Sequence, residues 1–219
     1  MRSFVLAAAL LGAASALPAQ QPAAGDPGKP AVGAQLPGGW LARLDRPDAK
    51  IEKLSFTTMG SGFHVTTGPA TILYDTAARA SGNYTVSATF TQTRAPAHPE
   101  AYGIFIDGRE LEGAGQSYMY FLVRGDGKVV VLHRAGADVH RIMEWTDHAA
   151  AVKADESGRA TNTLTAAAAS DSVRFLVNGQ PVMAISRAQL GSMDGAYGLR
   201  VNHNLDVHVA DLKYTPAAP

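Results

Sequence analysis

The feature that most constrains the fold is a strict alternation of apolar and polar side chains. It is clearest in the segment NYTVSATFTQ, residues 83–92, where the apolar positions are Tyr84, Val86, Ala88 and Phe90 and the residues between them are threonine or serine. A period of two is the signature of a β-strand with one buried face. The chain is therefore expected to be built mainly from strands.

Further strands are expected along the chain, joined by glycine-containing turns. The predicted ranges are 101–106, 117–124, 128–134, 162–169, 172–177, 181–185 and 197–214. The pairs that accept the positive φ angles of tight hairpin turns are Asp107-Gly108, Asp126-Gly127 and Asn178-Gly179. Only short helical turns are expected, within residues 146–156 and 186–190. Many strands around one core predict an all-β fold, an antiparallel two-sheet β-sandwich or jelly roll.

The chain ends predict export and one folded domain. Residues 1–19 read as a bacterial signal peptide, with a basic start, a short apolar run and small residues at the cleavage site. Residues 20–39 are rich in Pro, Gly and Ala and suit a linker, residues 40–214 suit the jelly-roll domain, and residues 215–219 suit a disordered tail. No later segment is long and apolar enough to span a membrane. The expected location is therefore secreted or periplasmic.

Charge and cysteine content exclude several classes of protein. Lys and Arg total 19, Asp and Glu also total 19, and the formal net charge is zero, so no overall field favours nucleic acid as a partner. The chain has no cysteine, which excludes a disulfide framework and a lipid-modified cysteine. Stability must come from the core, for which the alternation selects Val86, Phe90, Phe175, Val177, Leu199 and Leu205.

The C-terminal half resembles a known superfamily. The segments DSVRFLVNGQPVMAIS, residues 171–186, and GAYGLRVNHNLDVHVADLKY, residues 195–214, resemble the closing strands of the concanavalin A-like lectin/glucanase superfamily, which includes laminin G-like domains. The segments EAYGIFIDGREL and SYMYFLVRGDGKVVVLHR resemble its central strands, so that the resemblance covers roughly residues 50–214. It implies two curved sheets with a concave face that many relatives use to hold carbohydrate.

Motifs of the enzymatic relatives are absent. Laminarinase-type glucanases carry Glu-x-Asp-x-x-Glu, and no glutamate of this chain is followed two residues later by aspartate. The chain is also distantly similar to the bacterial 3-keto-disaccharide hydrolase domain, but its early Trp-x-x-x-x-Gly strand and its Asn-Ser-Gly strand are not evident here. Catalysis is left open, with non-catalytic binding favoured. A glycoside-type hydrolase would use Glu100, or Glu110 with Glu112, as paired carboxyl groups.

The segment NHNLDVHV, residues 202–209, is rich in polar side chains. As one continuous strand it would place His203 among apolar neighbours and Asn202, Asn204, Asp206 and His208 on the opposite face. Two histidines on opposite faces cannot hold one ion, so no metal site is predicted. The polar face would be either solvated or ligand-binding.

Loop residues and one tryptophan complete the candidate site. His98 and Glu100 precede a predicted strand and could contact sugar hydroxyls. Trp145 could stack on a sugar ring, although core packing is the competing role. Arg124-Gly125-Asp126 spells an adhesion tripeptide, but a hairpin turn accounts for it. Acids near Asp107 could bind calcium, but no calcium-loop signature is present and no cofactor is predicted.

The sequence thus predicts an exported β-sandwich that binds a carbohydrate or other extracellular ligand on a concave sheet face. The expected partner is a glycan, with no nucleic acid and no membrane span. The alternatives are a carbohydrate-active hydrolase and a structural or adhesive envelope module. The predicted ligand-binding residues are His98, Glu100, Trp145, Asn202, Asn204, Asp206 and His208. The identity of the sugar and the oligomeric state are left open.

Overall fold

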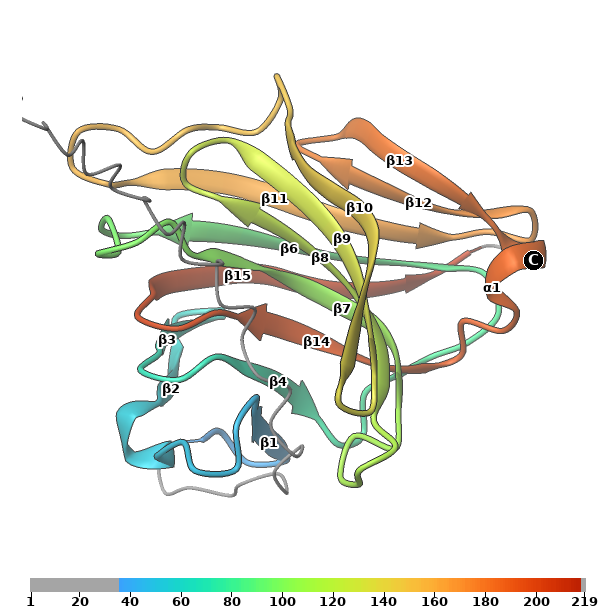
Figure 1. Cartoon of the computed structure of the whole chain (residues 1–219), viewed down its shortest axis with the longest axis horizontal. Helices are drawn as coiled ribbons and strands as arrows, with labels where there is room; N and C mark the ends of the chain where they lie inside the picture. Colours follow the sequence, from blue (N-terminus) through green and yellow to red (C-terminus); the bar gives the residue numbers. More distant parts are fainter. Residues whose placement is uncertain (1–35, 218–219) are drawn as a thin grey trace, which may run out of the picture.

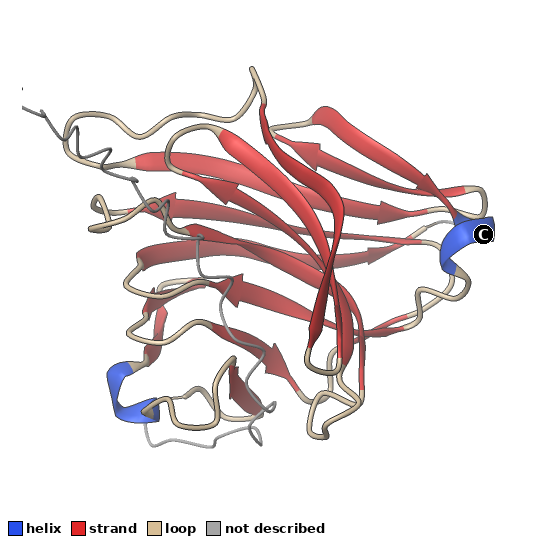
Figure 2. Ribbon diagram, in the orientation of Figure 1, coloured by secondary structure: helices blue, strands red, loops and turns tan. Residues whose placement is uncertain are grey.

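The computed structural model describes residues 36–217, which form two packed antiparallel sheets (Figure 1). Strands dominate these residues, and the helices are the 3-10 turn Ile51–Lys53 and the single turn α1, Arg187–Leu190 (Figure 2). The predicted signal peptide and most of the predicted linker lie outside the described residues. No helix among residues 36–217 has the length and apolar character needed to cross a membrane.

The first sheet has eight strands. In spatial order they are β1 (Trp40–Leu44), β4 (Thr71–Asp75), β14 (Gly195–Val201), β7 (Ala101–Arg109), β8 (Ser117–Arg124), β9 (Lys128–Ala135) and β10 (Asp138–Asp147), with β5 (Arg79–Ala80) beside β14. Strands β9 and β10 curve strongly along their length (Figure 1).

The second sheet has seven strands. In spatial order they are β13 (Gln180–Ser186), β12 (Ser172–Val177), β11 (Ala160–Ala168), β6 (Tyr84–Gln92), β15 (Asp206–Pro216), β3 (Gly62–Thr66) and β2 (Ser55–Met59). Strand β15 therefore runs two residues into the predicted tail. The all-β sandwich predicted from the alternation is confirmed.

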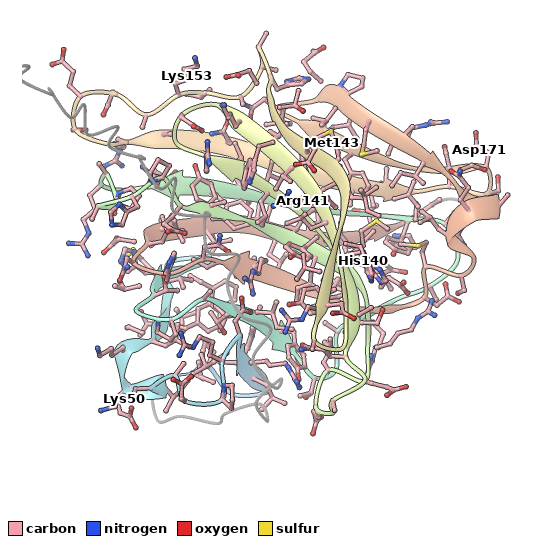
Figure 3. The ribbon with its side chains drawn as sticks, viewed as in Figure 1. Lys50, His140, Arg141, Met143, Lys153 and Asp171 are labelled. Atoms are coloured by element: carbon pink, nitrogen blue, oxygen red, sulfur yellow. The ribbon has the colours of Figure 1, made fainter. Side chains whose placement is uncertain are left out.

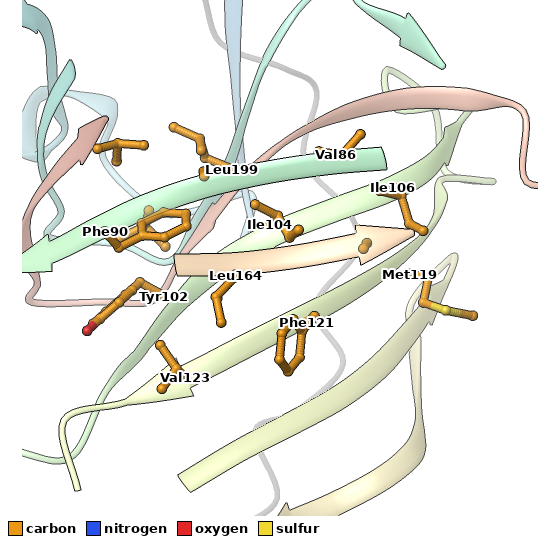
Figure 4. Packing of buried hydrophobic residues seen from close by; sticks show 14 of the residues in the cluster. Val86, Phe90, Tyr102, Ile104, Ile106, Met119, Phe121, Val123, Leu164 and Leu199 are labelled. Atoms are coloured by element: carbon orange, nitrogen blue, oxygen red, sulfur yellow. The ribbon is translucent and has the colours of Figure 1, made fainter. Parts of the chain in front are cut away.

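The main core fills the space between the two sheets. Rings from opposite sheets meet there, for example Phe121 of β8 and Phe175 of β12, whose centroids lie 5.5 Å apart. Figure 4 shows the same layer around Phe121, which also contains Leu164 of β11 and Ile104 of β7. All six residues that the sequence assigns to the core are at most 1% exposed, which confirms that assignment.

Two of the three predicted turn pairs form hairpin turns. Asn178 and Gly179, with φ angles of 50° and 77°, connect β12 to β13, and Gly127, with φ of 85°, lies in the turn between β8 and β9. The prediction for Asp107-Gly108 is wrong in position, because both residues lie inside β7. Asp107 does adopt a positive φ of 56°, but it does so where the pairing of β7 with β8 is irregular, and the chain reverses later, at residues 110–116.

Several elements differ from those predicted. The predicted strand 197–214 is two strands, β14 and β15, which belong to different sheets. Residues 146–156 contain the end of β10 and a loop rather than a helical turn. The turn predicted at 186–190 is confirmed as α1, where the hydroxyl of Ser186 accepts a hydrogen bond from the backbone N–H of Ala188.

Candidate functional site

The face of the eight-stranded sheet that points away from the main core is itself largely apolar and buried. A second hydrophobic cluster covers it, formed by Ile72, Tyr74, Ala101, Phe105, Leu111, Tyr118, Tyr120, Leu122, Val130 and Ala196. Strands β7 and β8 are consequently buried on both faces over most of their length. Outer faces of antiparallel sheets are commonly solvated and polar, so this one calls for a functional explanation.

Three arginines lie among these apolar residues. Arg43 of β1 and Arg200 of β14 both pair with Ile72 of β4 in the strand register, and Arg134 of β9 pairs with Tyr118 of β8. Residues in register share a face, so the arginines point to the same side of the sheet as the tyrosines. We define the arginine–tyrosine face as Arg43, Tyr74, Tyr118, Tyr120, Arg134 and Arg200.

Arg200 is paired with a carboxylate. Its Nη1 and Nη2 donate to the two carboxylate oxygens of Asp45, and its guanidinium also lies 5.6 Å from the ring centroid of Tyr120. Burial opposes ionisation of Asp45, but the attraction of Arg200 outweighs it and holds the pKa of this carboxyl below its usual value. Burial likewise acts against the charge of Arg200, and Asp45 raises the pKa of the guanidinium above its ordinary value. The two charges neutralise each other.

Arg43 and Arg134 have no carboxylate partner among the described residues. Nη1 of Arg43 donates to the carbonyl of Leu111 over 2.5 Å, and Nε of Arg134 donates to the carbonyl of Gly136 over 2.8 Å. Nε and Nη2 of Arg43 are buried without a hydrogen-bond partner in the described part of the chain, and so is the Tyr74 hydroxyl. Burial, with a contribution from the nearby charge of Arg134, lowers the pKa of Arg43.

A surface pocket of about 360 Å³ adjoins this face. Its lining is Tyr74, Arg79, Glu110, Leu111, Glu112 and Gly113. Tyr74 and Leu111 belong to the buried outer cluster, and the Leu111 carbonyl is the partner of Arg43, so the pocket lies next to the Arg43 guanidinium. The loop between β7 and β8 forms one wall of the pocket.

The accessible end of the same face carries Trp145. This residue of β10 packs against the outer cluster and is partly exposed, and the Arg124 guanidinium lies 4.6 Å from its ring centroid. On the same strand, Arg141 pairs in register with Leu132 and is exposed, while Met143 packs against the main core (Figure 3). Nε of Arg124 donates to Asp126, so the Arg-Gly-Asp tripeptide is folded onto itself in the turn.

The acidic candidates from the sequence lie at two places. Glu110 and Glu112 are exposed and line the pocket. Glu100 is buried, and its carboxylate lies 2.7 Å from Nδ1 of His203. His98 is exposed in the loop before β7.

The segment NHNLDVHV contains the crossover from one sheet to the other. Residues 202–205 form a turn in which Asn204 adopts a φ of 57° and His203 has a side chain that is 54% exposed. The expectation that His203 lies among apolar side chains is therefore wrong. Leu205 and the apolar residues of β14 and β15 pack into the same core from different sheets. Their spacing in the sequence therefore looks like the alternation of one continuous strand.

Asp206 and His208 lie on the outer face of the seven-stranded sheet. The Asp206 carboxylate is 3.2 Å from Nε2 of His64 and accepts hydrogen bonds from the hydroxyls of Thr66 and Thr93. This surface is otherwise rich in threonine, with Thr89 and Thr163 hydrogen-bonded across strands at 2.9 Å. It belongs to the opposite sheet from Trp145, so the predicted ligand-binding residues do not form one cluster.

Within residues 36–217, no three His, Asp or Glu side chains gather closely enough to hold a metal ion. The sequence reasoning missed the three arginines and the tyrosines of the outer face. Their signal was an arginine inside an otherwise apolar strand, as in WLARL and GAYGLRV. Such an arginine must be paired or bind a ligand, because an isolated buried charge is strongly destabilising.

Comparisons with known proteins support the architecture. No protein-family model matches the chain, and no curated protein matches it in sequence. Among solved structures it is similar to the carbohydrate-binding module CBM66 from Bacillus subtilis, with a TM-score of 0.59 and 11% identity over 80% of this chain and 94% of the module.

Two other solved structures lead to the same conclusion. A protein of unknown function with a galectin-like fold from Bacillus subtilis matches with a TM-score of 0.55 and 10% identity, over 82% of this chain and 90% of that one. The carbohydrate recognition domain of Emp46p matches with a TM-score of 0.51 and 10% identity, over 80% of this chain and 87% of that one. These likenesses show the fold: the chain is a concanavalin A-like jelly-roll sandwich, an architecture found in carbohydrate-binding proteins.

Proposed function

We propose that the protein is an exported carbohydrate-binding protein whose ligand lies on the outer face of the eight-stranded sheet. The single observation that carries the proposal is the composition of that face, where aromatic rings and arginines replace the usual solvated side chains. Aromatic rings offer flat apolar surfaces to sugar rings, and guanidinium groups donate several hydrogen bonds to sugar oxygens. Among the described residues, the threonine-rich face of the other sheet has no comparable group of rings.

Trp145 is the first contact in this proposal. Its ring is partly exposed at the edge of the outer cluster, and Arg124, whose Nε and Nη2 donate to Asp126, lies against it. A sugar stacked on Trp145 could extend along the sheet toward the pocket beside Tyr74. With the ligand on this face, Trp145 is the predicted ligand-binding residue that contacts it. Asp206 and His208 lie on the opposite side of the sandwich.

A glycan array on the full chain tests the proposal, with Trp145→Ala compared against Asp206→Ala and His208→Ala. Only Trp145→Ala is expected to weaken binding by about 10-fold or more, because this substitution removes a stacking ring and with it a large part of the contact. Unchanged binding in Trp145→Ala together with loss in Asp206→Ala would instead place the ligand on the threonine-rich sheet. Absence of binding to every glycan would overturn the proposal.

Export rests on residues 1–19. The apolar run ends at small residues, so the mature chain is expected to begin near Leu17 or Gln20. Mass spectrometry of the protein recovered from a bacterial periplasm or culture medium measures the N-terminus directly. Recovery of the chain only inside cells, with Met1 retained, would contradict export.

A further inference from the structure

Two buried positive charges on the arginine–tyrosine face are not neutralised by the described chain. Arg43 and Arg134 are 2% and 8% exposed, and among the described residues each donates only to a backbone carbonyl. The carboxylate of this region, Asp45, is already engaged by Arg200. The face therefore carries an excess of two positive charges in a buried setting.

Such an excess is unfavourable for folding. Removing a guanidinium from water without a counterion costs several kcal/mol, and neighbouring like charges add to this. Structures retain groups of this kind where they serve a ligand, because stability is commonly traded for function at binding sites. Nε and Nη2 of Arg43 are also without partners in the described residues, and these two donors form the flat edge that matches two oxygens of one anion.

We propose that this face recognises an acidic glycan, with Arg43 and Arg134 binding the carboxylate groups of uronic acid residues. The inference rests on the proposed carbohydrate binding and specifies its ligand class. Tyr74 lines the pocket beside Arg43, and its hydroxyl, which has no hydrogen-bond partner among the described residues, supplies a further polar atom. A carboxylate on this face would neutralise the buried charges and satisfy the unpartnered donors together.

The anion reaches Arg43 through the pocket next to it. Leu111 both lines this pocket and holds Nη1 of Arg43 through its carbonyl, so the loop of residues 110–116 lies over the guanidinium. Arg79 lines the same pocket and adds a positive charge there. Glu110 and Glu112 are also part of the lining, but both are exposed, so solvent screens their repulsion of an anion more than it screens the buried arginines.

Isothermal titration of the full chain with matched polysaccharides tests the inference. The probes are oligomers of polygalacturonate, alginate and hyaluronate, each compared with its carboxyl-reduced counterpart, which keeps the sugar backbone and loses the charge. At least one acidic oligomer is expected to bind about 10-fold or more tightly than its reduced form, since a charge-assisted hydrogen bond contributes roughly that factor. Raising the salt concentration should weaken this preference.

Variants assign the preference to the two arginines. Arg43→Gln and Arg134→Gln should each weaken acidic binding about 10-fold or more and weaken binding of the reduced oligomer by a smaller factor, so that the acidic preference falls. Arg174→Gln is the matched control, because Arg174 is exposed on the opposite sheet. Thermal melts of each variant check folding, and the salt dependence of the wild-type chain gives a second readout that needs no substitution.

The outcomes separate this inference from the proposed function. Equal binding of acidic and reduced oligomers, unchanged in both arginine variants, would overturn the acidic ligand and leave carbohydrate binding intact. An acidic preference that survives in both variants would place the anion elsewhere and also overturn the inference. Lack of binding to any glycan on the array would overturn both proposals.

Discussion

Asp45 and Arg200 form a pair whose two members depend on each other. Replacing Asp45 by Asn leaves Arg200, which is 6% exposed, as a third buried charge without a counterion. We expect Asp45→Asn to destabilise the protein by about 3–5 kcal/mol, the usual effect of removing one partner of a buried ion pair. Urea denaturation measures this change, with Asp48→Asn as control because its pair with Arg46 is exposed.

The pH dependence of this pair follows from the lowered pKa of Asp45. The folded state holds Asp45 ionised more strongly than the unfolded chain does, so its contribution is complete above the unfolded pKa of 3.8. The contribution is lost as the pH falls below that value. Asp45→Asn should therefore flatten the acid limb of the stability profile, and an acid limb identical to the wild type would contradict the assignment.

Asp107 is expected to behave in the opposite sense. Burial raises its pKa to about 6, against the partial compensation of Arg109, whose Nη2 lies 2.7 Å from the carboxylate. A carboxyl with a raised folded pKa stabilises fully below its unfolded pKa and loses that contribution as the pH rises to about 6. Asp107→Asn should therefore raise the free energy of unfolding at about pH 8 by about 2 kcal/mol and change it little near pH 3.5.

Asparagine suits this test because it also tolerates the positive φ of Asp107. Thermal melts of both proteins across this pH range measure the difference. A stabilisation of the same size at both ends of the range would mean that the effect does not arise from titration of the carboxyl.

His203 lies in a turn, so its substitution should have a small effect. Its ring is 54% exposed but its partner Glu100 is buried, so the loss of this contact is expected to change stability by about 1–2 kcal/mol. Leu205 lies two residues later and is buried, so Leu205→Ala should lower the free energy of unfolding by about 2–5 kcal/mol. Parallel melts of His203→Ala and Leu205→Ala compare the two, and a larger loss in the histidine variant would contradict the turn.

Among the elements, β11 holds the long loop of residues 148–159 through one buried side chain. Oδ1 of Asn162 accepts a hydrogen bond from the Val152 N–H over 2.8 Å, and its Nδ2 donates to the Val152 carbonyl over 3.1 Å. Asn178 of the following hairpin turn also donates to Asn162. One amide thus joins a strand, a loop and a turn.

We expect Asn162→Ala to destabilise the protein by about 1–3 kcal/mol, because it leaves these partners without a hydrogen bond. Amide hydrogen exchange should also become faster in residues 148–159, where the loop loses its anchor. Thr161→Ala, at an exposed neighbouring position, serves as the control. Exchange that accelerates equally across the whole sandwich would indicate global rather than local loosening.

The strands found from the sequence were marked by more than one signal. Strand β6 has one buried and one solvated face, which produces the alternation, and the β12–β13 hairpin is marked by its Asn-Gly turn. Strand β4 is buried on both faces at four of its five positions, and β10 is an edge strand exposed along most of its length. Neither arrangement gives a period of two, so the sequence alone did not reveal these strands.

At the scale of the whole molecule, the sandwich has two chemically different outer faces. The seven-stranded sheet exposes hydroxyl groups, while the eight-stranded sheet buries rings and arginines on its outer face and is exposed at its edge strand β10. The sequence could indicate Trp145 as a candidate contact, but it could not predict that the residues of the arginine–tyrosine face come together. Arg43, Arg134 and Arg200 are far apart in the chain and meet only because β1, β9 and β14 join one sheet.

Both outer faces depend on the packing of the two sheets against each other. Substitution of Phe175 tests how much this packing contributes to stability. Its ring is fully buried against Phe121 of the opposite sheet, so Phe175→Ala should lower the free energy of unfolding by about 3–5 kcal/mol. Leu176→Ala is the control, because its side chain points away from the core and is only partly buried. Denaturant midpoints measure both variants. Equal losses would mean that the two faces of β12 contribute equally to stability, which is incompatible with a core confined between the sheets.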